Sequence, residues 1–308
     1  MSVIAQAGAK GRQLHKFGGS SLADAKCYLR VAGIMKEYSQ AGDMMVVSAA
    51  GSTTNQLISW LKLSQSDRLA AHQVQQSLRR YHTELIGGLL EPAAADTLIA
   101  AFIHDLERLA GLLDGGVSEA VYAEVVGHGE VWSARLMAAV LNQLGMEAAW
   151  LDARAFLRAE RAAQPQVDEG LSYPLLQQLM AQHPNKRLVV TGFISRNQAG
   201  ETVLLGRNGS DYSATQIGAL AGASRVTIWS DVAGVYSADP RKVKDARLLP
   251  LLRLDEASEL ARLAAPVLHA RTLQPVSASD IDLQLRCSYT PEQGSTRIER
   301  VLASGTGA

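Results

Sequence analysis

A lysine followed by two glycines and two serines lies near the start of the sequence, in the segment KFGGSS at 16–21. The residue pattern predicts a short strand over 13–17 before it and a helix over 22–40 after it. Glycines at a helix start let backbone N–H groups approach an anion, and Lys16 supplies a full positive charge beside them. The segment therefore suits a phosphoryl group, although a purely structural glycine turn would have the same sequence.

A second glycine loop, GRNGSDYS at 206–213, opens another predicted helix. Arg207 can bind a carboxylate or a phosphate through two parallel hydrogen bonds. The backbone amides around Ser210 can hold a phosphate, while Asp211 can orient Lys16 or a magnesium ion. A simpler interpretation, in which Ser210 or Asp211 only caps the helix, also fits the local sequence.

A third polar segment, at 228–241, follows a predicted strand and carries aromatic, acidic and cationic residues suited to a nucleotide. Ligands of open α/β sheets bind at such carboxyl ends of strands. The sequence contains neither a GxxxxGK[ST] phosphate loop nor a GxGxxG dinucleotide motif. Both absences argue against a P-loop NTPase and against an NAD-binding unit.

Strands and helices alternate along the chain, which predicts an α/β fold with one continuous, mostly parallel sheet and two lobes. The predicted strands lie at 13–17, 44–47, 147–151, 187–192, 225–230 and 282–287. The predicted helices lie at 22–40, 56–63, 118–144, 173–183, 210–221 and 254–273. Residues 67–113 read as a helical pair, and residues 193–205 as a β-hairpin that forms a lid or rim.

Composition excludes several classes of function. The 308 residues hold 30 basic and 30 acidic side chains, so we expect no nucleic-acid partner and no attraction to an anionic membrane surface. No uncharged apolar run is long enough to span a membrane. Cys27 and Cys287 fit no metal-binding spacing and are expected to be buried free thiols of a cytoplasmic protein. The seven histidines form no metal-binding cluster, and His128 fits either a pocket wall or a packing position.

The three polar segments together resemble the signatures of aspartokinases. The segment 16–21 is similar to their KFGG[ST]S motif, 206–213 to GRGGSDYT, and 230–241 to TDVxGIYTxDPR. The similarity extends to the serine and threonine loop at 47–55 and to Gly-Glu at 129–130, so it covers nearly the whole chain. Within the family, it is strongest to the bifunctional methionine-pathway members, whose kinase is fused to a homoserine dehydrogenase.

This resemblance implies a three-layer αβα sandwich of the amino-acid-kinase type. A single domain would span 1–308, with an amino-acid-binding lobe over about 1–200 and a nucleotide-binding lobe over about 201–308. The implied reaction is transfer of the γ-phosphoryl group of ATP to the β-carboxylate of L-aspartate, the first step of lysine, methionine and threonine biosynthesis. Magnesium is expected with ATP, without an assigned protein ligand.

The resemblance also implies a role for each matching residue. Lys16 would stabilise the transferring phosphoryl group, and Asp211 would organise that lysine. The phosphates would be lined by Gly18, Gly19, Ser20, Gly209 and Ser210. Aspartate would be held by Thr54, Glu130 and Arg207, with Glu130 facing its α-ammonium and Arg207 facing its α-carboxylate. ATP would contact Ser230, Asp231, Tyr236 and Arg241.

Two residues depart from the family pattern. Pro266 stands where family members usually have a lysine that touches the nucleotide, so one positive charge is lost unless Lys242 or Lys244 replaces it. Asn208 stands where the family usually has glycine, a mild change because asparagine also enters left-handed turns.

Two other functions stay open, namely a kinase for another amino acid, such as glutamate or acetylglutamate, and a non-catalytic ligand-binding or assembly module. The resemblance further implies a homodimer. Aspartokinases normally continue into small regulatory domains, so we expect this chain to be a fragment of a longer polypeptide, without feedback inhibition of its own.

Overall fold

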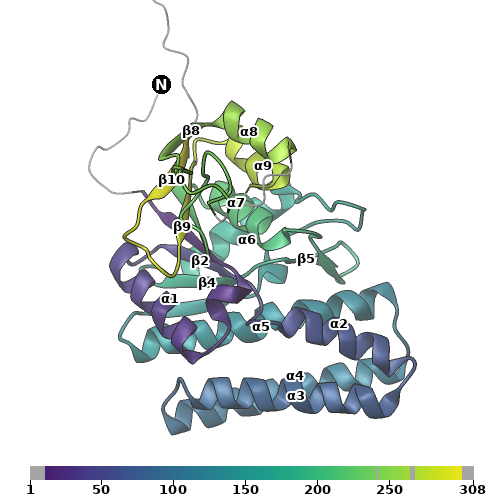
Figure 1. The fold of residues 1–308 in the computed structure, drawn as a ribbon. Helices are drawn as coiled ribbons and strands as arrows, with labels where there is room; N and C mark the ends of the chain where they lie inside the picture. The colour runs from purple at the N-terminus through teal and green to yellow at the C-terminus, as the bar shows by residue number, and fades with distance from the viewer. Residues whose placement is uncertain (1–10, 241, 264–267, 300–308) are drawn as a thin grey trace, which may run out of the picture.

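The computed structural model describes residues 11–240, 242–263 and 268–299. Its centre is an eight-stranded sheet with the order β3-β4-β2-β1-β7-β9-β10-β8. Every neighbouring pair is parallel except β9 and β10. Helices cover both faces, so the predicted three-layer αβα fold with a mostly parallel sheet is confirmed (Figure 1).

The strands of the large sheet are β1 (Gln13–Phe17), β2 (Met44–Val47), β3 (Ala148–Leu151), β4 (Arg187–Thr191), β7 (Arg225–Ser230), β8 (Leu251–Arg253), β9 (Asp282–Cys287) and β10 (Ser295–Glu299). A separate two-stranded hairpin consists of β5 (Ile194–Arg196) and β6 (Thr202–Leu204). The α-helices are α1 (Ala25–Tyr38), α2 (Thr53–Ser64), α3 (Arg68–Gly87), α4 (Pro92–Asp114), α5 (Glu119–Gln143), α6 (Glu169–Gln182), α7 (Gly209–Leu220), α8 (Leu254–Arg262) and α9 (Ala270–Ala278). Short 3₁₀ helices are η1 (Gly19–Leu22) and η2 (Ala153–Ala155).

The central strands are apolar on both faces because helices cover both. Along β2 the four residues Met44–Val47 are all buried and alternate between two apolar layers. Met45 and Val47 pack with α1 and α5, whereas Met44 and Val46 pack with α6 and α7. This continuous apolar run fixes the sheet in the middle of the molecule, with the carboxyl ends of β1, β2 and β7 at one edge.

The predicted helical pair is confirmed as α3 and α4, which lie side by side below the sheet layers in Figure 1. The two helices pack with α2 and α5 through a continuous set of buried leucines and aromatic residues. Asp67 caps α3 through a hydrogen bond from the Ala70 amide, and Pro92 begins α4 at a position that needs no N–H donor. We call α2, α3 and α4 the helical arm.

The structure differs from the sequence-based prediction in the last third of the chain. The helix predicted over 254–273 is interrupted, since α8 ends at Arg262 and α9 begins at Ala270. Pro266 lies outside the described residues. Two short strands, β8 and β10, were not predicted. Both lie at one side of the sheet, where β10 pairs with β9 and β8 pairs with β10. Their few residues alternate between buried and more exposed positions, so pairing with a neighbouring strand rather than local sequence defines them.

Helix starts are the other difference. The helix predicted from residue 22 begins at Ala25, because η1 occupies the preceding turn and the Asp24 side chain caps α1 by accepting from the Cys27 amide. The helix predicted from residue 173 begins at Glu169, where Asp168 accepts from the Leu171 amide. In the described ranges, no helix combines the length and apolar character that crossing a membrane requires.

Candidate active site

A pocket of about 450 Å³ opens where the carboxyl ends of β1 and β2 meet α5 and the start of α7. Loops and helix starts far apart in sequence form its wall. Nine residues predicted for the site line this pocket: Lys16, Gly18, Gly19, Thr54, Glu130, Arg207, Gly209, Ser210 and Asp211. The structure therefore brings the two glycine loops and the predicted aspartate-binding groups into one place.

Lys16 and Asp211 form the ionic centre of the pocket. Lys16 is the next-to-last residue of β1 and Asp211 lies in the first turn of α7, and their charged atoms, Nζ and Oδ1, are 2.5 Å apart. Helix α7 is capped by Asn208, which adopts a left-handed conformation with φ 55°, so neither Ser210 nor Asp211 is the N-cap. The simpler capping interpretation is wrong, and the Asp211 carboxylate instead fixes the position of the lysine.

One glycine in each loop, Gly19 and Gly209, is required by close packing. A Cβ atom at Gly19 would lie 2.8 Å from the carbonyl oxygen of Ala49, and the Gly19 carbonyl accepts a hydrogen bond from the Gly51 amide at 3.0 Å. A Cβ atom at Gly209 would lie 2.7 Å from the Phe193 ring. Larger residues would push the loops apart, so the glycines keep the pocket wall intact.

Glu130 is a buried carboxyl group without a full set of partners. It lies on α5 and is 3% exposed. One oxygen, Oε1, accepts from the Ala49 amide at 3.3 Å, while Oε2 has no hydrogen-bond partner among the described residues. Burial raises the pKa of Glu130 to about 8, against the opposing effects of backbone hydrogen bonds and of Lys16. A cationic ligand in the pocket would satisfy Oε2 and favour the ionised form.

The start of α2, which carries Thr53 and Thr54, is held from behind by α3. Thr53 Oγ1 donates to the Ala50 carbonyl at 2.6 Å, so its lone pair is free to accept from His82 Nε2 at 3.1 Å. His82 on α3 is fully buried, and burial lowers its pKa to about 3, so the ring is neutral. Sequence analysis gave neither residue a role. Only the packing of α3 on α2 brings His82 to the first turn of α2, which carries Thr54.

Three of the predicted nucleotide residues lie at or after the end of β7, the next strand along the sheet. Ser230 ends β7, which pairs with β1, and its hydroxyl accepts from the Val232 amide at 3.2 Å. Asp231 is exposed and Tyr236 is half-buried. None of these three side chains lines the pocket described above, and Arg241 lies outside the described residues.

Ser20 departs from its predicted place. Its side chain is exposed and does not line the pocket, and its carbonyl accepts from the Tyr289 hydroxyl at 3.3 Å. The next residue, Ser21, is buried and shares a hydrogen bond of 2.8 Å with the hydroxyl of Ser288 after β9. The loop therefore directs its glycines toward the pocket and the Ser21 side chain toward the residues that follow β9.

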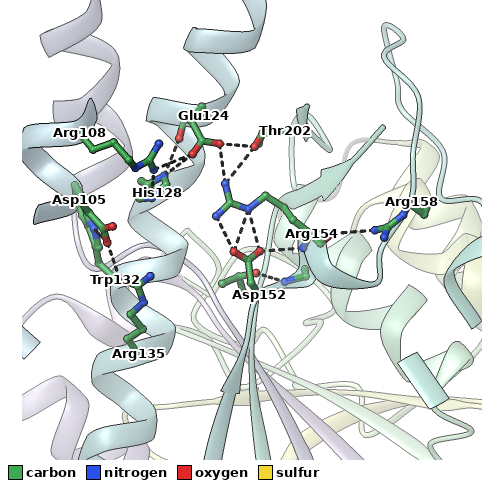
Figure 2. Close-up of polar contacts among 12 residues, drawn as sticks. Asp105, Arg108, Glu124, His128, Trp132, Arg135, Asp152, Arg154, Arg158 and Thr202 are labelled. Carbon is green, nitrogen blue, oxygen red and sulfur yellow. Dashed lines mark hydrogen bonds and ion pairs between the residues drawn. The ribbon is translucent and has the colours of Figure 1, made fainter. Parts of the chain in front are cut away.

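His128 occupies the packing position rather than the pocket wall. Its ring lies between α4 and α5, where Nε2 is 2.9 Å from Arg108 Nη2 and Nδ1 is 3.0 Å from the Glu124 carbonyl (Figure 2). Within the described part of the chain, no group of three or more His, Cys, Asp or Glu side chains is arranged to hold a metal ion. Cys27 and Cys287 are buried free thiols, as predicted.

Comparisons with known proteins agree with this geometry. A model of the amino acid kinase family matches residues 11–287. The chain is 87% identical over 308 residues to bifunctional aspartokinase/homoserine dehydrogenase 2 of Escherichia coli K12, covering 100% of this chain and 38% of that protein. It is 32% identical over 286 residues to lysine-sensitive aspartokinase 3 of the same organism, covering 92% of this chain and 63% of that protein.

A solved structure is also similar. The crystal structure of E. coli aspartokinase III in complex with aspartate and ADP matches with a TM-score of 0.85 and 29% identity, over 95% of this chain and 65% of that chain. The chain thus spans less than two thirds of the length of the two curated relatives named above.

Proposed function

The chain belongs to the amino acid kinase family, and from that premise we propose that it transfers the γ-phosphoryl group of MgATP to the β-carboxylate of L-aspartate. The observation that carries the proposal is the pocket in which Lys16, paired with Asp211, lies among the same wall residues as the unpaired carboxyl of Glu130 and the guanidinium of Arg207. One group suits a phosphoryl group, and the other two suit a free amino acid. The similarity to an aspartokinase that binds aspartate and ADP supports the same assignment.

The chemistry of this reaction requires no general base. A β-carboxylate with an ordinary pKa of about 3.9 is already ionised at neutral pH and can attack phosphorus directly. The obstacle is repulsion between two anions, so catalysis depends on alignment and on neutralisation of charge. Lys16 is suited to this task because Asp211 fixes its ammonium group at the end of β1.

Recognition of aspartate follows from the other two groups. Glu130 Oε2, which lacks a partner, would accept from the α-ammonium group, and that contact would ionise the carboxyl. Arg207 would bind the α-carboxylate, and Thr54 would contact the substrate from the start of α2. The two charged contacts would leave the β-carboxylate directed toward the phosphates.

ATP would lie with its phosphates against Gly18, Gly19, Gly209 and Ser210, whose positions in the pocket support that role. We assign the base and sugar to the segment that follows β7, including Ser230, Asp231 and Tyr236. Magnesium bound by the ATP phosphates would neutralise part of their charge, and the protein need supply few ligands of its own. The amino-acid-binding part would then be formed mainly by residues before about 200, and the nucleotide-binding part by residues after it.

The relative that is 87% identical extends well beyond this chain, since the chain covers 38% of it. We propose that the natural polypeptide likewise carries regulatory and homoserine dehydrogenase domains, assembles as a homodimer and acts in the cytoplasm. Its kinase would then supply the first step of lysine, methionine and threonine biosynthesis.

A panel of acceptors tests the proposed reaction. The chain is incubated with MgATP, hydroxylamine and either aspartate, glutamate or acetylglutamate, and the acyl hydroxamate is measured. Aspartate should give the largest signal, because acetylglutamate has no ammonium group for Glu130 and glutamate carries one extra methylene. A larger signal with another acceptor would assign the pocket to a different amino acid. Binding of ATP and aspartate without any hydroxamate would instead indicate a non-catalytic module.

A further inference from the structure

A cluster of charged side chains lies beside the pocket and takes no part in it. Glu124 is on α5, six residues before Glu130, and its carboxylate meets groups from three other segments (Figure 2). Oε2 accepts from Arg154 Nη1 at 2.7 Å and from the Thr202 hydroxyl at 2.5 Å, and Oε1 accepts from Arg108 Nη2 at 2.9 Å. The Arg154 and Thr202 groups are buried, so this carboxylate is satisfied by protein rather than by water.

Arg154 is the centre of the cluster. Its guanidinium binds Asp152 through Nε and Nη2, with Nη2 and Oδ2 2.6 Å apart, and turns Nη1 toward Glu124 and Thr202. The side chain is 9% exposed. A buried arginine between two carboxylates has a fixed orientation, because every donor that turns away would lose a charge-assisted hydrogen bond. Arg154 thereby joins η2, at the end of β3, to both α5 and β6.

The helical arm completes the cluster. Arg108 on α4 donates to Glu124 and lies 2.9 Å from His128 Nε2. Because arginine has only donors, Nε2 must accept, and Nδ1 then carries the proton that is donated to the Glu124 carbonyl. His128 is therefore neutral. Two arginines and two carboxylates balance in charge, which permits their partial burial.

The cluster meets the hairpin at β6, the strand that carries Thr202. The two-stranded β5–β6 sheet is separate from the main sheet, and such a hairpin has little stability of its own. Its β5 edge is held by backbone bonds of Arg196 to Leu157 and Ala159. Its β6 strand lies against α5 at Gly127, where a Cβ atom would be 3.5 Å from Leu204 and 3.6 Å from Thr202, and the Thr202 hydroxyl fixes it there by its hydrogen bond to Glu124.

We propose that Glu124, Arg154 and Thr202 are positioning residues that lock β6 onto α5, and thereby set Arg207 relative to Glu130 across the aspartate-binding part of the pocket. Arg207 follows the end of β6 by three residues, and Glu130 follows Glu124 on the same helix by six. The lock thus joins the elements that carry the two groups proposed to hold the ends of the amino acid. This inference rests on the proposed function, since aspartate is the ligand that would sense the change.

Thr202→Val tests the lock with little risk to folding, because it removes a hydroxyl and keeps the shape of the side chain. Thr202→Ser keeps the hydroxyl and serves as the conservative variant. Thr97→Val is the matched control, since Thr97 is exposed on α4 and bonds only the Ala93 carbonyl within its own helix. For all three and the parent chain, KM for aspartate, KM for ATP and kcat are measured. Hydrogen exchange of the amides over 194–206 is followed in parallel.

The expected result is a rise of about tenfold in KM for aspartate in Thr202→Val, the size of one lost hydrogen bond to a carboxylate. KM for ATP should stay within about twofold, and exchange over 194–206 should be faster. Thr202→Ser and Thr97→Val should resemble the parent. An Arg154→Lys variant keeps the charge but loses the planar set of guanidinium donors. Its KM for aspartate should change in the same direction as that of Thr202→Val.

Two results would overturn the inference. One is unchanged KM for aspartate with unchanged exchange of the hairpin amides in Thr202→Val. The other is an equal rise of both KM values, which would indicate a general loss of stability. If the parent chain phosphorylates no acceptor, the proposed function fails, and the exchange measurement alone tests the positioning role. Exchange over 194–206 that is as slow in Thr202→Val as in the parent would then still reject it.

Discussion

The two ends of the proposed active site are built differently. On the amino-acid side, Glu130 is 3% exposed, and the start of α2 is fixed by a hydrogen bond between Thr53 and His82 of α3. On the nucleotide side, Asp231 is exposed, and the chain from there to β8 contains one isolated β-bridge, between Tyr236 and Leu248, and no helix or strand among its described residues. Removing the partner of a buried polar group costs much free energy, whereas water replaces the partner of an exposed group. The difference predicts strong discrimination of the acceptor and individually weak contacts with the nucleotide.

Lys16→Ala should have the largest effect, because this residue lies where the two ends meet. Loss of the ammonium beside the transferring group should lower kcat by roughly 10²–10³-fold. Steady-state kinetics should show this fall, with Lys62→Ala, an exposed lysine on α2, as the control that stays near the parent. A fall of less than tenfold would assign the main positive charge of the site to another residue.

Glu130→Gln tests the buried end directly. The change keeps the size of the side chain but removes the negative charge proposed to face the α-ammonium group. KM for aspartate should rise by about 10–100-fold, while KM for ATP should change little. A parallel rise in KM for ATP would erase the distinction between the two ends.

The raised pKa of Glu130 also predicts a pH dependence. Below a pH of about 8 the free carboxyl is mostly protonated, and an ammonium ligand must displace that proton. Affinity for aspartate should therefore increase as the pH rises from about 6 to 8. At pH 7, binding should release the Glu130 proton to the buffer. Titration calorimetry in two buffers of different ionisation enthalpy measures this release, which should vanish in Glu130→Gln.

Stability should show the opposite trend with pH. The folded-state pKa of about 8 lies above the ordinary 4.5, so the native state holds the extra proton between these values. The stabilising effect of the neutral form is complete below about 4.5 and is lost as the pH rises through about 8. The unfolding temperature of the parent should therefore fall relative to that of Glu130→Gln between pH 6 and 9. Parallel curves for the two proteins would place the pKa of Glu130 in its ordinary range.

The contrast between the two ends also separates what the sequence could predict from what it could not. Local sequence was enough to identify the glycine loops, Lys16 and Asp211 as candidates, because phosphate chemistry needs those residue types next to strand ends and helix starts. The alternating strands and helices likewise predicted the fold. His82, Glu124 and Arg154 carry no local signal, because the contacts that define them are distant in sequence. His82 lies 29 residues from Thr53, Glu124 lies 30 from Arg154, and Arg154 lies 48 from Thr202. Only the packing of the helical arm and the hairpin against α5 reveals them.

His82 offers a finer test of the buried end. His82→Gln places an amide N–H near the position of the imidazole Nε2, whereas His82→Asn is too short to reach Thr53. His82→Asn should raise KM for aspartate by about fivefold, the effect of one ordinary buried hydrogen bond, and His82→Gln should stay closer to the parent. Kinetics of both variants, with thermal unfolding as the measure of stability, distinguishes them. Equal effects of the two substitutions would mean that the ring acts by packing against Phe102 and Trp132 and not by its hydrogen bond.

Asp231→Asn should give the smallest effect, because its side chain is exposed and water can replace what it loses. We expect KM for ATP to rise by about two- to threefold, with KM for aspartate unchanged. Asp245→Asn, an exposed aspartate of the same segment, is the matched control for a general change in charge. Measured side by side, Asp231→Asn and Glu130→Gln decide the comparison, since a larger change in KM for ATP than in KM for aspartate would reverse it. In that case the exposed segment, and not the buried carboxyl, would dominate ligand binding, and the order of the effects predicted here would fail at both ends.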